Sequence, residues 1–188
     1  MRTIKKVASH IFIDGFGGMT QGLFATLIIG TMIQQIGLLI GGSTGNVIYL
    51  LGKAAAALTS AGIGVGVAVK YGESPLVTVS AAVAAMVGGY AGKITGGTFF
   101  VDGNAVLAGP GEPLGAFIAA FAGITCGHLV SGKTKVDIIV TPVITIGAGS
   151  VVGLLVGPPI SQMMTGLGSI INWATEQRPF IMGIVVSV

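Results

Sequence analysis

A long stretch without charge lies near the start of the chain, where no acidic or basic residue occurs between Asp14 and Lys53. Its apolar centre, Gly22–Ile40, has about the 20 residues that a helix needs to cross a hydrocarbon layer of about 30 Å. Only 8% of the 188 residues are charged, whereas charged residues make up about 25% of a soluble domain. A chain with so few charges cannot cover a surface that faces water, and lipid must therefore be its main solvent.

Four further apolar runs follow, separated by short polar segments, and each has the composition of a membrane-spanning helix. Stretches such as 81–87 do not alternate apolar and polar residues, as the strands of a membrane barrel would. The sequence therefore predicts an all-α, polytopic transmembrane helix bundle of about five full spans, in a single domain over residues 1–188. The four later runs are Val47–Val69, Pro75–Ala91, Leu114–Val130 and Ile138–Val156.

Three other segments differ from these runs. Residues 93–113 are rich in glycine and proline and predict a long loop. Pro158 and Pro159 predict the end of the fifth span, and Ile160–Gln177 then mixes polar with apolar residues, which is typical of a re-entrant or interfacial segment. The last run, Pro179–Val188, is too short for a helical span, which indicates that the chain is the first part of a longer protein.

The positions of the basic residues favour one orientation in the membrane. If the N-terminus is cytoplasmic, the inner ends of the predicted spans carry six basic residues and the outer ends carry two, with Lys53 left uncounted inside a span. Cytoplasmic loops hold an excess of lysine and arginine, so this distribution predicts a cytoplasmic N-terminus. The inner residues are Arg2, Lys5, Lys6, Lys70, Lys133 and Lys135, and the outer ones are Lys93 and Arg178.

Several functions are disfavoured by composition. The basic residues are scattered singly without aromatic residues between them, which argues against nucleic-acid binding. The single cysteine, Cys126, can form no intramolecular disulfide, and together with two distant histidines it does not form a metal-ligand pattern. No P-loop or nucleophile elbow is present. We therefore expect no metal, no cofactor and no catalytic residues within this chain.

Glycine is unusually frequent, at 33 of 188 residues. Small residues in membrane helices allow close packing of backbones, and they also occur in broken helices that line polar cavities, so both explanations can hold. An internal similarity joins Ser74–Val79 to Thr141–Ile146, 67 positions later, each at the start of a run rich in glycine and alanine. This similarity indicates either a duplicated pair of spans or a chance likeness between small-residue helices.

Polar groups near membrane depth are energetically costly, which makes each one a candidate for a substrate contact. Glu112 precedes the fourth run, where a carboxylate could also stabilise a helix N-terminus. Glu176 lies in the mixed segment, two residues before Arg178. Histidine and amide side chains within spans and loops can bind sugar hydroxyls or a neighbouring helix. The substrate-binding candidates are thus Glu176, Glu112, His128, Asn104 and Gln35.

Three segments, Gly15–Met19, Val130–Pro142 and Gly157–Ile160, carry a likeness to a known family. They resemble the IIC membrane subunit of the bacterial phosphotransferase system, in the branch that includes perfringolysin regulator-like proteins. The resemblance implies a homodimeric permease in the bacterial plasma membrane. Such a permease moves a sugar inward while a separate IIB subunit, supplied with phosphate through IIA, phosphorylates that sugar.

The resemblance also bears on the sugar contact and on an alternative role. Glucose-type members hold the sugar through the glutamate of a Gly-Ile-Thr-Glu motif, and here Thr175-Glu176 matches its second half while Trp173-Ala174 replaces the first. The same branch contains regulators, so a membrane-embedded sensor without transport is the alternative hypothesis. Its partner-docking patch would be formed by Lys133, Lys135 and Asp137, although a positive-inside anchor also explains these charges.

Overall fold

The computed structural model describes residues 10–101, 103–107 and 109–177, and most of these are helical. Two elements, η1 and η2, are π-helical turns. The elements in chain order are η1 (His10–Gly15), α2 (Phe16–Leu23), η2 (Phe24–Ile28), α3 (Ile29–Ile40), α4 (Gly42–Ala57), α5 (Thr59–Lys70), α6 (Pro75–Gly89), α7 (Ala91–Thr95), β1 (Phe100–Val101), β2 (Asn104–Ala105), α8 (Pro113–Val130) and α9 (Asp137–Gln177).

The long apolar helices follow the predicted runs and confirm an all-α membrane helix bundle. Three of them are long and apolar enough to cross a membrane: the continuous helix Ile13–Ile40, α8, and the segment Asp137–Trp173 of α9. Helices α4 and α5 are apolar enough only as a pair, and they are bent by 53° at the break between them, which is the geometry of a broken span or a re-entrant loop. The third run forms α6, a shorter apolar helix of 15 residues.

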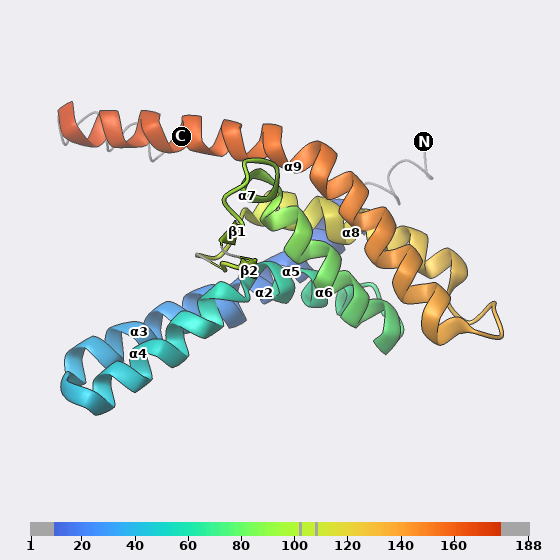
Figure 1. Cartoon of the computed structure of the whole chain (residues 1–188), viewed down its shortest axis with the longest axis horizontal. Coiled ribbons are helices and arrows are strands. Elements are labelled where there is room, and N and C mark those ends of the chain that lie inside the picture. Colours follow the sequence, from blue (N-terminus) through green and yellow to red (C-terminus); the bar gives the residue numbers. More distant parts are fainter. Residues whose placement is uncertain (1–9, 102, 108, 178–188) are drawn as a thin grey trace.

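The first two runs form one long antiparallel helical hairpin. Its first leg passes from α2 through η2 into α3, and its second leg returns through α4 and α5. Gly41 and Gly42 make the connecting turn, where φ angles of 66° and 63° favour glycine over residues with a Cβ. Figure 1 shows α3 and α4 side by side, extending away from the centre of the molecule as a separate arm. We call α3 and α4 the outer hairpin.

Glycines face one another along this hairpin. A Cβ atom added to Gly18 would lie 2.6 Å from the carbonyl oxygen of Gly66, and one added to Gly37 would lie 2.7 Å from that of Gly45. The same mutual obstruction joins Gly22 to Gly62 and Gly30 to Gly52. Only residues without a side chain allow the two legs to approach this closely.

The core consists of α5, α6 and α8, with α2 and α9 packed against them. Small side chains also dominate these contacts: a Cβ on Gly115 would lie 2.7 Å from the carbonyl oxygen of Gly88, and one on Gly149 would lie 2.6 Å from that of Ala119. The larger apolar side chains fill the spaces between the crossings. The buried core residues are Ile63, Val67, Ala68, Val77, Ala81, Ala85, Ala116, Phe117, Ala120 and Ile124.

Helix α9 departs from the prediction. The sequence predicts that the fifth span ends at Pro158 and Pro159, and this is wrong, because α9 continues through both prolines and through Pro142 for 41 residues. Proline inside a helix removes a backbone hydrogen bond and bends the helix without always ending it. Figure 1 shows α9 changing direction part-way along its length. The mixed segment Ile160–Gln177 is therefore the second half of this helix.

The predicted loop over residues 93–113 is only partly irregular. Helix α7 extends to Thr95, and β1 pairs with β2 in a short antiparallel hairpin, with Phe100 opposite Ala105. The predicted duplication would relate the helix pair α5–α6 to the pair α8–α9. These two pairs pack on each other, because α6 contacts both α8 and α9. The duplication itself stays a prediction.

Replacing Gly22 with alanine should destabilise the protein, because the added methyl group would overlap the carbonyl oxygen of Gly62. Overpacking of this kind costs about 1–3 kcal/mol. Gly147→Ala is the matched control, since nothing lies within 4 Å of its added Cβ and alanine favours a helix over glycine by about 1 kcal/mol. Unfolding of both purified full-length variants in detergent measures the difference. Equal stability of the two variants would contradict the glycine packing.

Candidate functional site

A short loop, Gly109–Glu112, leads into α8 and is held at three points. The backbone N–H of Glu112 donates to the carbonyl oxygen of Gly89 at 2.7 Å. The hydroxyl of Ser60 donates to the carbonyl oxygen of Pro110 at 3.0 Å, and the hydroxyl of Tyr90 donates to that of Gly109. Ser60 and Tyr90 are buried, so these hydrogen bonds fix the loop from inside the protein.

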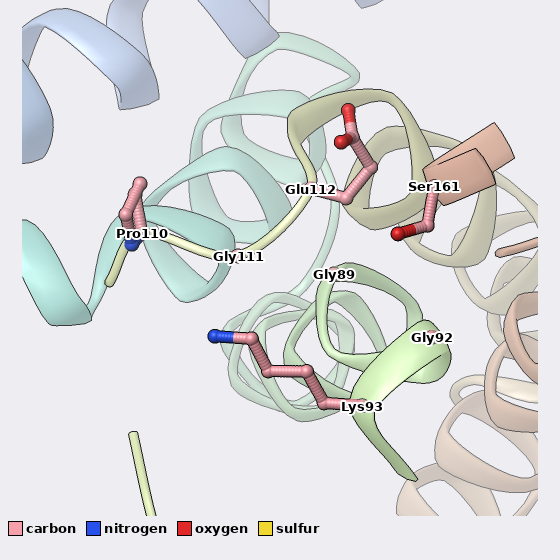
Figure 2. Close-up of a pocket in the computed structure, with 7 residues that line it drawn as sticks. All are labelled: Gly89, Gly92, Lys93, Pro110, Gly111, Glu112 and Ser161. Atoms are coloured by element: carbon pink, nitrogen blue, oxygen red, sulfur yellow. The ribbon is translucent and has the colours of Figure 1, made fainter. Parts of the chain in front are cut away.

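The loop forms one wall of a pocket of about 220 Å³. Three polar side chains reach it from different elements: Lys93 from α7, Glu112 from the residue before α8, and Ser161 from α9. Figure 2 shows the Ser161 hydroxyl turned toward the middle of this group of residues, while the Glu112 carboxylate points away from Lys93. The remaining lining residues are Gly89, Gly92 and Gly111.

Glycines keep the pocket open and bring its walls together. A Cβ on Gly92 would lie 2.9 Å from the Ser161 Oγ, so α7 and α9 meet here at the distance that glycine allows. Gly111 has a φ of 75°, and its Cβ would overlap the hydroxyl of Ser60. A side chain at either position would therefore displace a polar residue that belongs to the pocket or supports it.

The pocket is lined by one acidic residue, Glu112, and one basic residue, Lys93. Burial raises the pKa of the Glu112 carboxyl above its ordinary value, and a hydrogen bond from the backbone of Leu114 partly opposes this. The Lys93 ammonium lies 5.3 Å from the centre of the Tyr90 ring, a distance that allows a cation–π interaction. The pocket thus offers a carboxyl acceptor, an ammonium donor and the Ser161 hydroxyl, which can do both.

Of the substrate-binding residues predicted from the sequence, Glu112 lines this pocket. His128 lies at the other end of α8. There the His128 Nδ1 lies 2.9 Å from the Glu73 carboxylate, while most of the His128 side chain is exposed. Asn104 lies on the exposed strand β2, and Gln35 is exposed on α3. The side chain of Glu176 lies outside the described part of the structure.

The three predicted docking residues lie at the turn between α8 and α9. Lys133 and Lys135 are exposed there. Asp137 is the first residue of α9, and its carboxylate accepts hydrogen bonds from the Gly132 N–H at 2.9 Å and the Thr141 hydroxyl at 2.6 Å. Asp137 therefore stabilises the turn and the start of α9, and the two lysines present the positive charge.

Sequence reasoning missed two of the three polar pocket residues. It identified Lys93 only as an outer flanking charge, and it gave no role to Ser161, which lies in the segment predicted to be re-entrant or interfacial. Both residues come close to Glu112 only because α7 and α9 meet at Gly92 and Ser161, a tertiary contact without a local sequence signal. Within the described ranges, no group of three histidine, cysteine, aspartate or glutamate residues could hold a metal ion.

Comparison with known proteins adds one finding. A family model described as "Phosphotransferase system, EIIC" matches residues 13–188. Neither a curated protein nor a solved structure matches the chain.

Water should reach the pocket. In a Cys126→Ala background, Ser161→Cys is expected to react with a small, charged methanethiosulfonate reagent, because Ser161 lines the pocket and is only partly buried. Thr145→Cys is the matched control on the same helix, since Thr145 is fully buried and a cysteine there should react much more slowly. Labelling of the full-length protein in membranes measures both rates. Equal rates would contradict an accessible pocket.

Proposed function

The chain belongs to the phosphotransferase system EIIC family, and we propose that it binds and translocates a sugar through the pocket formed by Lys93, Glu112 and Ser161. The family makes the protein a sugar permease component in a membrane. We also propose an orientation of the chain in the membrane and a partner that phosphorylates the sugar.

The observation that carries the proposal is that three residues with different polar groups, Lys93, Glu112 and Ser161, line one small pocket. Sugar hydroxyls are both donors and acceptors, and they are bound best by a mixture of carboxyl, ammonium and hydroxyl groups in fixed positions. The volume of about 220 Å³ lies below the roughly 300–1,000 Å³ that is typical of sites for drug-sized ligands. This size favours a single sugar ring over a disaccharide.

The distribution of charge suggests how the site lies in the membrane. The pocket is at the N-terminal end of α8, and the exposed Lys133 and Lys135 follow its C-terminal end. The 18 residues of α8 span about 27 Å. If the basic turn faces the cytoplasm of a bacterium, in accordance with the positive-inside rule, the pocket lies toward the outer face. A site in that position can receive a sugar from outside the cell.

The basic turn between α8 and α9 is then the surface that faces the cytoplasmic phosphotransfer subunits. Lys133 and Lys135 are exposed, while the neighbouring Asp137 carboxylate is engaged by Gly132 and Thr141. The positive charge is therefore available to a partner with an acidic or phosphorylated surface. We assign this surface to a IIB subunit, which would phosphorylate the sugar as it enters.

Replacing Glu112 with glutamine should weaken sugar binding. Loss of a charge-assisted hydrogen bond costs about 1.5–3 kcal/mol, which is roughly a tenfold to hundredfold fall in affinity. Affinity in the wild-type protein should also fall as the pH is lowered through the raised pKa of Glu112, because the protonated carboxyl accepts hydrogen bonds less strongly. That pH dependence should be absent from Glu112→Gln.

Equilibrium binding of a panel of radiolabelled monosaccharides to the purified full-length protein provides the measurement. Glu73→Gln is the matched control, since it makes the same chemical change beside His128 at the other end of the core. Glu176→Gln tests the residue that the family motif favours. Unchanged affinity in Glu112→Gln with reduced affinity in Glu176→Gln would move the site to the second half of α9.

Reversing the charge of Lys133 and Lys135 together should reduce phosphotransfer-dependent sugar uptake and leave sugar binding unchanged, because the two lysines lie far from the pocket. Exposed charges at an interface mainly accelerate association, so the arginine pair at the same positions should retain uptake. Uptake of labelled sugar by cells that contain the full-length protein measures both. Intact uptake with altered gene expression would support a regulator instead.

A further inference from the structure

Both legs of the long hairpin depart from a regular α-helix at the same level. On the first leg, the π-helical turn η2 interrupts the α-helix at Phe24–Ile28. On the second leg, Leu58 separates α4 from α5, which are bent by 53° relative to each other. The two interruptions are neighbours, since a Cβ on Gly62 would lie 2.6 Å from the Thr26 side chain of η2. We call these two adjacent interruptions the hinge.

The outer hairpin beyond this hinge is packed mainly on itself. Among the described residues, α3 and α4 make their extensive contacts with each other and with η2, and few with the core helices. Its outward side chains are large and apolar, including Leu39 at 86% exposure and Leu51 at 63%. A rotation of the outer hairpin at the hinge would therefore break few contacts with the core helices.

Two buried hydroxyls connect the hinge to the pocket loop. The Tyr90 hydroxyl bonds to the carbonyl oxygen of Gly109 and lies 3.3 Å from that of Ala57, the last residue of α4. The Ser60 hydroxyl, from the first turn of α5, donates to Pro110. The residues on either side of Leu58 are thus both linked to the segment that ends in Glu112.

The Ser60 hydroxyl is closely packed between two glycines. The positions that a Cβ would take on Gly89 and on Gly111 both overlap the Ser60 hydroxyl. Backbone from the end of α6 and from the pocket loop therefore closes around one side chain. A shift of Ser60 with the start of α5 would therefore press on this loop or pull on it through Pro110.

We infer that Tyr90 and Ser60 are positioning residues that couple the angle of the outer hairpin to the position of the Glu112 loop. A change of angle at Leu58 moves the carbonyl of Ala57 relative to Ser60, and the two hydroxyls pass this movement to Gly109 and Pro110. The loop that carries one wall of the pocket then moves with the outer hairpin. The identity of the pocket's ligand as a sugar rests on the proposed function, but the coupling itself does not require it.

Distance measurements without any ligand test the coupling. Spin labels at Leu39→Cys on α3 and Val79→Cys on α6, both on exposed positions, report the hairpin angle by double electron–electron resonance in the full-length Cys126→Ala protein in nanodiscs. The 12 residues of α3 form a lever of about 18 Å, so a rotation of about 10° moves its tip by about 3 Å.

Gly111→Ala should shift this distance, because the added methyl group pushes against the Ser60 hydroxyl. Adding Ser60→Ala, which removes that oxygen, should restore the wild-type distance. Gly97→Ala is the matched control: it has a similar positive φ of 70°, but nothing lies near its Cβ, and it should leave the distance unchanged. A shift in Gly111→Ala no larger than that in Gly97→Ala would overturn the coupling.

Tyr90→Phe provides a second test that does not strain the backbone. It retains the ring and removes the hydroxyl that contacts Ala57 and Gly109, so the distance distribution should broaden. Tyr49→Phe, the same change within the outer hairpin, should not broaden it. Equal distributions in these two variants would also overturn the coupling. Since no sugar is present, this result and a failure of sugar binding in Glu112→Gln are distinguishable.

Discussion

Direct contact between helix backbones is the interaction on which the rest of this structure depends. In lipid, apolar side chains gain little by leaving their solvent, so helices associate through close packing and polar contacts between them. This chain achieves close packing with glycine: Gly18 with Gly66, Gly37 with Gly45, and Gly88 with Gly115 each remove the side chains that would hold two helices apart. The core contacts among α5, α6, α8 and α9 follow the same rule with alanine and threonine added.

Such packing also determines where a polar site can form. Within the glycine crossings there is no space for a ligand, and the buried side chains between them are mostly apolar. Space opens where α6 ends and α8 begins, because the chain leaves the helix there and the loop before α8 is held to Gly89, Ser60 and Tyr90 by hydrogen bonds. Lys93, Glu112 and Ser161 are placed around that opening by the ends of helices and by the middle of α9. Other glycines act at this edge, where Gly92 allows α7 to approach Ser161 of α9.

Much of the fold could be predicted because each span is a local property of the sequence. Apolar runs of about 20 residues predict membrane helices wherever they occur, and α8 differs from its predicted run, Leu114–Val130, by one residue. The prolines of α9 misled the prediction, because a double proline usually ends a helix, whereas this helix bends and continues. The site was less predictable. Glu112 is conspicuous as a carboxylate before an apolar run, whereas Lys93 and Ser161 lie 68 residues apart and are joined only by the packing of α7 on α9.

The π-helical turn η2 determines where the length of the hairpin can change during evolution. Insertion of one residue into an α-helix rotates everything beyond it by about 100°, which would turn Gly30 and Gly37 away from Gly52 and Gly45. A π-helical turn accommodates one extra residue within a helix, and η2 lies between the glycine pairs near the core and those of the outer hairpin. Single-residue insertions or deletions can therefore be absorbed at Phe24–Ile28, while homologues should keep a constant spacing between glycines on either side of it.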